Sequence, residues 1–244
     1  ASDSDYTGNT LYAGATLGPC AGRISNGWLS LPAKKYHLTR NEKNRHCLHS
    51  GIHSVSFINW TLVSVREEDT CAEALFQCTL PDCCDGFPGN RTFSVSYLLN
   101  EAHELTVRYR AVSDKTTYFN MSNHSYFNLS GNFEESVYDH LLQIHAHSYI
   151  YNDDEFIPEG IAPVENSPFD FRKFLIFSFN IPCASFVLIQ SLNIKTKSNR
   201  VDIGVRVELP YAIFSTLTDE LYESKIVYRT EKFQDKVRTF CMNP

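Results

Sequence analysis

The sequence predicts an all-β protein, specifically a large antiparallel β-sandwich. Apolar and polar side chains alternate over many short segments, as they do in half-buried strands. Turn-forming pairs such as Asn26-Gly27 and Pro88-Gly89 lie between such segments. Sustained helical periodicity is nearly absent. Many short strands joined by frequent turns are typical of a sandwich or barrel.

The clearest expected element is a hairpin. Thr92–Asn100 and Glu104–Ser113 both alternate apolar and polar residues, and the connection between them is as short as hairpin loops are. Further strands are expected at Ser54–Val65, Ala74–Leu80, Leu141–Tyr151, Phe186–Lys195, Val201–Glu208 and Lys225–Thr230.

The chain has the composition of a globular protein, with 244 residues of which 43% are hydrophobic and 20% charged. Because no internal repeat or low-complexity linker divides it, we expect one domain over residues 1–244. The uncharged stretch Phe174–Leu192 approaches the length of a membrane span. Polar residues and Pro182 interrupt it, which favours two buried strands over a span.

Charge and cysteine usage restrict the partners and the location. The net charge is −6 and no basic patch stands out, so no nucleic-acid partner is expected. The N-terminus is polar and acidic, unlike a secretion leader. The 8 cysteines lack CxxC and zinc-knuckle spacings. These features favour a cytoplasmic protein with reduced thiols, with disulfides as the alternative.

Several histidines are candidate metal ligands. His145 and His147 alternate along the expected strand 141–151, so both would point to one face. A solvated strand face is favoured over a metal site there. His46, His49 and His53 lie in a loop-like segment without a standard zinc spacing. The sequence therefore predicts no metal and no other cofactor.

His124 has a different setting. Amides, hydroxyls and aromatic rings surround it in the segment 120–129. Such a mixture can hydrogen-bond sugar hydroxyls while an aromatic face covers the C–H groups of the sugar. An imidazole with a pKa near ~6.5 can also donate or accept a proton at neutral pH. From these residues alone, a hydrogen-bonded structural histidine is an equal alternative.

Asn123-His124-Ser125-Tyr126-Phe127-Asn128-Leu129 resembles the N-H-S-Y-F-N-L signature of the aldose 1-epimerase family. Leu48-His49-Ser50-Gly51 resembles the family's L-H-G-G, with Ser50 in place of a glycine. The other family motifs G-A-T-x-G-x-x-A-x-R-I, D-G-F-P-G-N, I-P-x-G and P-F-D-F-R are matched, in order, at residues 14–24, 85–90, 157–160 and 168–172. The resemblance covers residues 12 to 172.

The resemblance implies a fold and an activity. Members of the family have a large antiparallel β-sandwich and interconvert the α and β anomers of hexoses such as galactose and glucose, without a cofactor. By the same resemblance, His124 is the general acid, and Arg23 and His49 contact sugar hydroxyls. The expected partner is a small-molecule aldohexose, with no membrane partner, and the chain is expected to be a monomer or a homodimer.

The sequence also departs from the family. Residues 173–218 diverge, and the motif with the family's general base, a glutamate, is not recognisable there. Glu208 is the nearest acidic candidate for this base upstream of Asp219-Glu220, but its flanking residues do not match the base motif, which favours a surface or strand-end role for it. We therefore expect a sandwich that is incomplete relative to the family. A carbohydrate-binding protein without turnover, lacking the base, is the alternative function.

Overall fold

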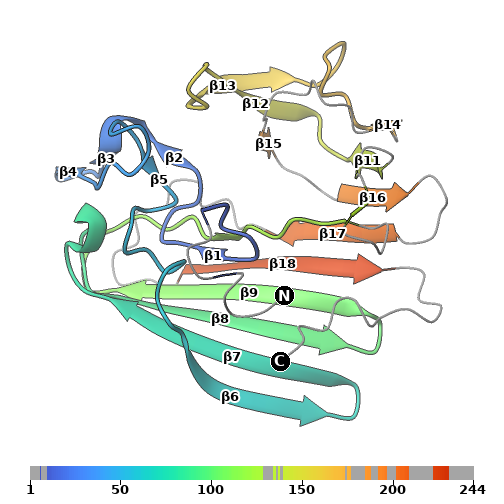
Figure 1. The fold of residues 1–244 in the computed structure, drawn as a ribbon, viewed down its shortest axis with the longest axis horizontal. Helices are drawn as coiled ribbons and strands as arrows, with labels where there is room; N and C mark the ends of the chain where they lie inside the picture. Colours follow the sequence, from blue (N-terminus) through green and yellow to red (C-terminus); the bar gives the residue numbers. More distant parts are fainter. Residues whose placement is uncertain are drawn as a thin grey trace. The chain divides into compact units, whose positions relative to one another are not determined.

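The computed structural model describes residues 6, 10–128, 134–135, 137 and 140–173, and the backbone of strands at 175–176, 185–187, 192–196, 202–208 and 222–230. The elements named between residues 16 and 230 are strands, apart from two short 3-10 turns (Figure 1). They are β1 (Thr16–Leu17), β2 (Arg23–Ile24), η1 (Ser25–Gly27), β3 (Trp28–Ser30), β4 (Lys35–His37), β5 (Cys47–Leu48), β6 (Thr61–Glu68), β7 (Cys71–Leu80), η2 (Cys84–Gly86), β8 (Arg91–Asn100), β9 (Glu104–Ser113), β10 (Ser122–Asn123), β11 (His140–Ile144), β12 (Ser148–Asn152), β13 (Pro158–Pro163), β14 (Leu175–Ile176), β15 (Ser185–Val187), β16 (Leu192–Thr196), β17 (Asp202–Glu208) and β18 (Tyr222–Thr230).

The chain separates into two compact units. The first contains residues 1–98, 107–126 and 209–225, and the second contains residues 99–106, 127–208 and 226–244. The single domain expected over residues 1–244 stays a prediction.

The main sheet of the first unit has the strand order β9-β8-β7-β6 (Figure 1). The predicted hairpin is confirmed as β8 and β9, and the strand predicted at 74–80 is confirmed within β7. In the hairpin turn, the His103 N–H donates to the Asn100 carbonyl oxygen at 3.0 Å, and the Glu104 N–H donates to Asn100 Oδ1 at 3.0 Å. One asparagine thus accepts two backbone donors and closes the turn.

Alternating side chains of this hairpin enter the core. Phe93, Val95, Val107 and Tyr109 are all buried. Phe93 meets Phe119 edge to face, with 5.7 Å between the ring centroids. Burial of each such side chain stabilises the fold by roughly 1.5–3 kcal/mol relative to exposure. The period-2 pattern in the sequence therefore marks the core face correctly.

The strand predicted at Ser54–Val65 is wrong in its first half, because β6 begins only at Thr61. The preceding residues form a turn in which the Phe57 N–H donates to the Ser54 carbonyl oxygen at 3.0 Å. The indole Nε1–H of Trp60 donates to the Val55 carbonyl oxygen at 3.0 Å. These local bonds replace the sheet ladder that the β-branched and aromatic composition suggested.

A second core lies beneath the short strand pairs of the first unit. β1 pairs with β10, β2 with β5, and β3 with β4. Its buried residues are Cys20, Leu29, Leu38, Cys47 and Phe87. The thiols of the described cysteines at positions 20, 47, 71, 78, 83 and 84 are free. It includes Leu29 of β3 and Cys47 of β5, and Ile24 of β2 and Tyr36 of β4 pack against it.

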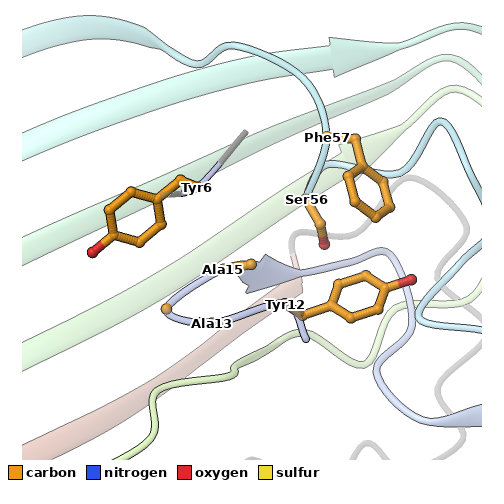
Figure 2. Close-up of a pocket in the computed structure, with 7 residues that line it drawn as sticks. Tyr6, Tyr12, Ala13, Ala15, Ser56 and Phe57 are labelled. Carbon is orange, nitrogen blue, oxygen red and sulfur yellow. The ribbon is translucent and has the colours of Figure 1, made fainter. Parts of the chain in front are cut away.

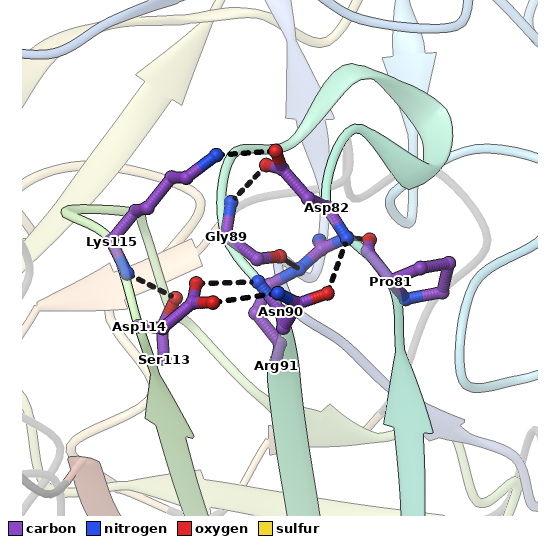
Figure 3. A network of polar contacts seen from close by, with 8 residues as sticks. All are labelled: Pro81, Asp82, Gly89, Asn90, Arg91, Ser113, Asp114 and Lys115. Atoms are coloured by element: carbon purple, nitrogen blue, oxygen red, sulfur yellow. Dashed lines mark hydrogen bonds and ion pairs between the residues drawn. The ribbon is translucent and has the colours of Figure 1, made fainter.

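The turn that matches D-G-F-P-G-N is held by a polar network (Figure 3). Asp82 Oδ1 accepts the Gly89 N–H at 2.6 Å, and its other oxygen pairs with the Lys115 ammonium. The Asp114 carboxylate accepts the backbone N–H and the side-chain amide of Asn90 at 2.7 and 2.6 Å. Beneath them, Arg91 is buried. The predicted turn at Pro88-Gly89 is confirmed, with a φ of 87° at Gly89.

The second unit contains the strand orders β14-β11-β16-β17 and β13-β12-β15. The single strand predicted at Leu141–Tyr151 is wrong, because the chain bends between β11 and β12. The Ala146 N–H turns back to the Ile144 carbonyl oxygen at 3.0 Å. His145 and His147 therefore lie in the bend and do not share a strand face.

The predictions for the C-terminal part fall partly outside the described residues. Of Phe174–Leu192, the structure describes only the backbone of β14, β15 and the first residue of β16. The strand predicted at 186–195 corresponds to β15 and β16, and residues 188–191 between them lie outside the described part. In the portions of the chain that are described, no helix is long and apolar enough to cross a membrane. The predicted strands at 201–208 and 225–230 are confirmed as β17 and β18.

Candidate active site

The pairing of β2 with β5 brings two of the predicted sugar ligands together. Arg23 lies opposite Leu48 in the register, and His49 is the next residue after β5. The Arg23 guanidinium binds the Glu42 carboxylate through two hydrogen bonds of 2.7 and 2.6 Å. This bidentate pair restricts the guanidinium to one orientation. It also holds the pKa of Glu42 below its usual value.

The His49 ring is oriented by backbone groups of Gly22. The Gly22 N–H donates to the ring atom Nδ1 of His49 at 3.1 Å, and the backbone N–H of His49 donates to the Gly22 carbonyl oxygen at 2.9 Å. Because Nδ1 accepts a hydrogen bond, the proton of the neutral ring belongs on Nε2. His49 therefore presents one N–H donor, at Nε2. Gly22 has a φ of 81°, a conformation that favours glycine.

His124 directly follows β10 and lies beside His49. β10 pairs with β1, and the backbone of His124 continues this pairing. Its N–H donates to the Ala15 carbonyl oxygen at 3.0 Å, and its carbonyl oxygen accepts the Gly14 N–H at 3.1 Å. The imidazoles of His124 and His49 lie edge to face, with 5.4 Å between their centroids. Tyr126 covers His124 at 4.9 Å. Residues from separate motifs thus form one cluster.

Tyr12 completes the cluster. Its ring centroid lies 4.7 Å from that of His49 and 6.2 Å from that of His124. On its other side Tyr12 contacts Phe57, at 5.2 Å. Burial and, to a smaller extent, the neighbouring Cys47 and Glu42 raise the pKa of the Tyr12 phenol, so it stays protonated at neutral pH.

A pocket adjoins this cluster through Tyr12 (Figure 2). Its volume is about 250 Å³, and its lining is mostly apolar. Neither His49 nor His124 belongs to the lining, which consists of Tyr6, Tyr12, Ala13, Gly14, Ala15, Ser56 and Phe57. The histidine pair thus lies beside the pocket and not inside it.

The electrostatics of the cluster set the protonation state of His49. Burial, followed by positive charge at His124 and Arg23, lowers the pKa of His49 to about 4, against a smaller raising effect of Glu42. His49 is therefore neutral at pH 7. The environment thus disfavours a positive charge on the His49 imidazole.

The lowered pKa of His49 predicts a pH-dependent stability. The unfolded chain binds a proton at this residue near pH 6.5, whereas the folded chain binds it near pH 4. Between these values the unfolded state holds more protons, so the free energy of unfolding falls as the pH drops through this window. The stabilisation is complete above pH 6.5 and lost below pH 4. Solvent screening of the partly exposed ring limits it to roughly 1–2 kcal/mol.

Urea denaturation at several pH values between 7 and 4 tests this expectation, with His49→Gln as the comparison. The wild-type free energy of unfolding should fall more steeply than that of the variant. Parallel pH curves would show that His49 has an ordinary pKa in the folded protein.

The other histidines weighed as metal ligands have separate partners. His46 is buried, and its Nδ1 accepts the Asn26 N–H at 3.1 Å. His53 is exposed and lies 3.6 Å from a carboxylate oxygen of Asp85. Over the described ranges, no group of three His, Cys, Asp or Glu side chains could hold a metal ion. Glu208 is the last residue of β17, and its side chain lies outside the described part of the chain.

Sequence reasoning assigned no role to Tyr12, Glu42, Phe57 and Ser50. Tyr12 and Phe57 lie outside the recognised motifs, and aromatic residues are common in β proteins. β3 and β4 lie between Arg23 and Glu42 in the chain, so only the fold reveals the ion pair. Ser50 departs from the L-H-G-G motif, and this departure is the one signal in the sequence that points to a special role for it.

A sequence model of the aldose 1-epimerase family matches residues 1–218 of this chain. The chain belongs to the aldose 1-epimerase family. The match extends beyond Arg172, where the recognisable motifs end, to within a few residues of β18.

Individual family members support this assignment. Galactose mutarotase of Rattus norvegicus is 39% identical over 169 residues, which are 69% of this chain and 47% of that protein. Aldose 1-epimerase of Escherichia coli K12 is 33% identical over 174 residues, which are 71% of this chain and 49% of that enzyme. This family member therefore spans about half the length of the curated relatives that it matches.

Solved structures of the family show the fold. The aldose epimerase homologue from C. elegans aligns with a TM-score of 0.81 at 20% identity, covering 96% of this chain and 87% of that one. Galactose 1-epimerase from Lactobacillus acidophilus aligns with a TM-score of 0.82 at 24% identity, covering 94% and 83%. The predicted all-β, mutarotase-like β-sandwich class is thereby confirmed.

Proposed function

We propose that this aldose 1-epimerase family member interconverts the α and β anomers of an aldohexose, with galactose and glucose as the first candidates. One observation carries the proposal. Two imidazoles from separate family motifs lie 5.4 Å apart, and one of them, His49, is held neutral with its N–H on Nε2. A neutral donor beside a second, protonatable imidazole suits a substrate whose hydroxyls must be bound while one oxygen is protonated.

The reaction needs one base and one acid. The base removes the proton of the C1 hydroxyl, and the electron pair forms the C1 carbonyl as the bond from C1 to the ring oxygen breaks. The acid gives its proton to the ring oxygen. After rotation about the C1–C2 bond, the reverse steps close the ring on the other face. We assign the acid role to His124, since positioned proton transfer contributes typically ~10²–10⁴-fold.

His49 and Arg23 are proposed as sugar ligands. His49 would donate from Nε2 to a sugar hydroxyl, and the Arg23 guanidinium, oriented by Glu42, would donate to another. Because His49 is neutral, it adds no positive charge beside a protonated His124. Such fixed donors reject a sugar that places its hydroxyl elsewhere, since the donors would be left unpaired.

Glu208 is proposed as the candidate base on sequence grounds alone, as the nearest acidic residue upstream of Asp219-Glu220. A Glu208→Gln variant decides this assignment. A large loss of rate with sugar affinity retained would identify Glu208 as the base, and an unchanged rate would remove it. The cytoplasmic location and the monomeric or homodimeric state also stay predictions.

Polarimetry tests the proposed function. Freshly dissolved α-D-galactose and α-D-glucose are followed with purified protein and with a buffer blank, and we expect faster mutarotation with the protein. If a folded protein gives no acceleration but binds galactose in calorimetry, the alternative of a carbohydrate-binding member without turnover is favoured. If it neither accelerates the reaction nor binds either sugar, the proposal is wrong.

A further inference from the structure

The loop that carries His49 has an unusual backbone. His49, Ser50 and Gly51 all have positive φ angles, of 47°, 72° and 99°. Residues other than glycine adopt this region at a cost of about 1 kcal/mol or more each. A run of three residues with positive φ, two of them not glycine, persists only where surrounding contacts hold it.

Ser50 supplies such contacts. Its Oγ accepts the Cys20 N–H at 2.6 Å and donates to the Cys20 carbonyl oxygen at 2.9 Å. Ser50 and Cys20 are both buried, with 2% and 4% exposure. Hydrogen bonds in such a setting have no competing water, and their loss would leave two buried backbone groups without partners.

The segment that Ser50 binds is the one that orients the His49 ring. Cys20 precedes Gly22 by two residues, and Gly22 exchanges the two hydrogen bonds with His49 described above. Four hydrogen bonds therefore join residues 20–22 to residues 49–50. At the far end of the loop, the Asp85 carboxylate accepts the N–H groups of Ile52 and His53 at 3.2 and 2.7 Å.

We propose that Ser50 is a positioning residue that keeps the His49 imidazole against the Gly22 N–H, so that Nε2–H is the donor offered to a ligand. The Ser50 side chain is buried and does not take part in the proposed reaction. The family motif L-H-G-G has glycine at this position, and glycine has no hydroxyl. The two hydrogen bonds between the Ser50 hydroxyl and Cys20 are therefore a departure of this chain from the motif. The statement that Nε2–H binds a ligand rests on the proposed sugar-binding function. The statement that Ser50 orients the His49 ring does not depend on that function.

The test compares Ser50→Ala with Ser54→Ala. Ser54 is a matched control: it is also fully buried, lies in the same loop, and its Oγ has no hydrogen-bond partner among the described residues. A proton–nitrogen correlation spectrum of the His49 ring distinguishes the protonated from the unprotonated nitrogen. We expect Ser54→Ala to keep the wild-type pattern and Ser50→Ala to lose its fixed Nε2–H tautomer, with galactose binding about 5- to 10-fold weaker.

Ser50→Gly provides the second variant. It removes the hydroxyl but also relieves the left-handed strain, so it should fold even if Ser50→Ala does not. A wild-type ring spectrum in either Ser50 variant would overturn the inference. If the wild-type protein binds no sugar, the proposed function fails, whereas the ring spectra still decide whether Ser50 orients His49.

Discussion

Mutarotation by a His124→Ala variant is expected to fall to about 1% of the wild-type rate or less. The imidazole is the proposed proton donor to the ring oxygen, and such transfers contribute typically ~10²–10⁴-fold. The fold should survive, because within the described part of the chain the His124 side chain makes ring contacts, to Tyr12, His49 and Tyr126, and no hydrogen bond. Loss of such contacts costs about 1 kcal/mol.

Polarimetry and thermal unfolding of the same preparation separate chemistry from stability. His103→Ala serves as the control, because His103 is an exposed residue in the β8–β9 turn. We expect this variant to keep the wild-type rate. A His124→Ala protein with a wild-type-like rate would remove His124 from the mechanism, even if the activity itself is real.

Arg91→Met is expected to lower the free energy of unfolding by about 3 kcal/mol. Arg91 is 1% exposed. Its Nε donates to the Gly89 carbonyl oxygen at 3.0 Å, and its Nη2 donates to those of Pro81 and Cys84 at 2.9 and 3.3 Å. A methionine fills much of the volume but leaves three carbonyl oxygens without this donor.

Urea denaturation measures this loss, with Arg108→Met as the control. Arg108 is exposed on the neighbouring strand β9, and its replacement should change the free energy of unfolding by about 0.5 kcal/mol or less. Arg91→Lys should fall between the two, since a lysine keeps the charge but cannot span several carbonyls with one rigid fork. A loss below about 1 kcal/mol in Arg91→Met would show that the turn does not depend on the guanidinium.

The strand pattern was predictable where burial alternates. Burial alternates over 91–95 in β8 and 107–112 in β9 because one face is in the core, and their hairpin was found with nearly correct ends. The pattern failed at Ser54–Trp60 and at Ile144–His147. In both places the composition suits a strand, but hydrogen bonds within the segment turn the chain, and composition contains no information about them.

The sequence by itself determined the fold class and three of the proposed site residues, because the motifs around Arg23, His49 and His124 are local and occur in the family's order. Only the tertiary structure decided how these residues act on each other. The tautomer of His49 depends on the Gly22 N–H, its lowered pKa on burial and on charges from distant segments, and its loop on the Ser50 hydroxyl. Each of these effects weakens steeply over a few ångströms, and such distances are set only when β1, β2, β5 and β10 have paired.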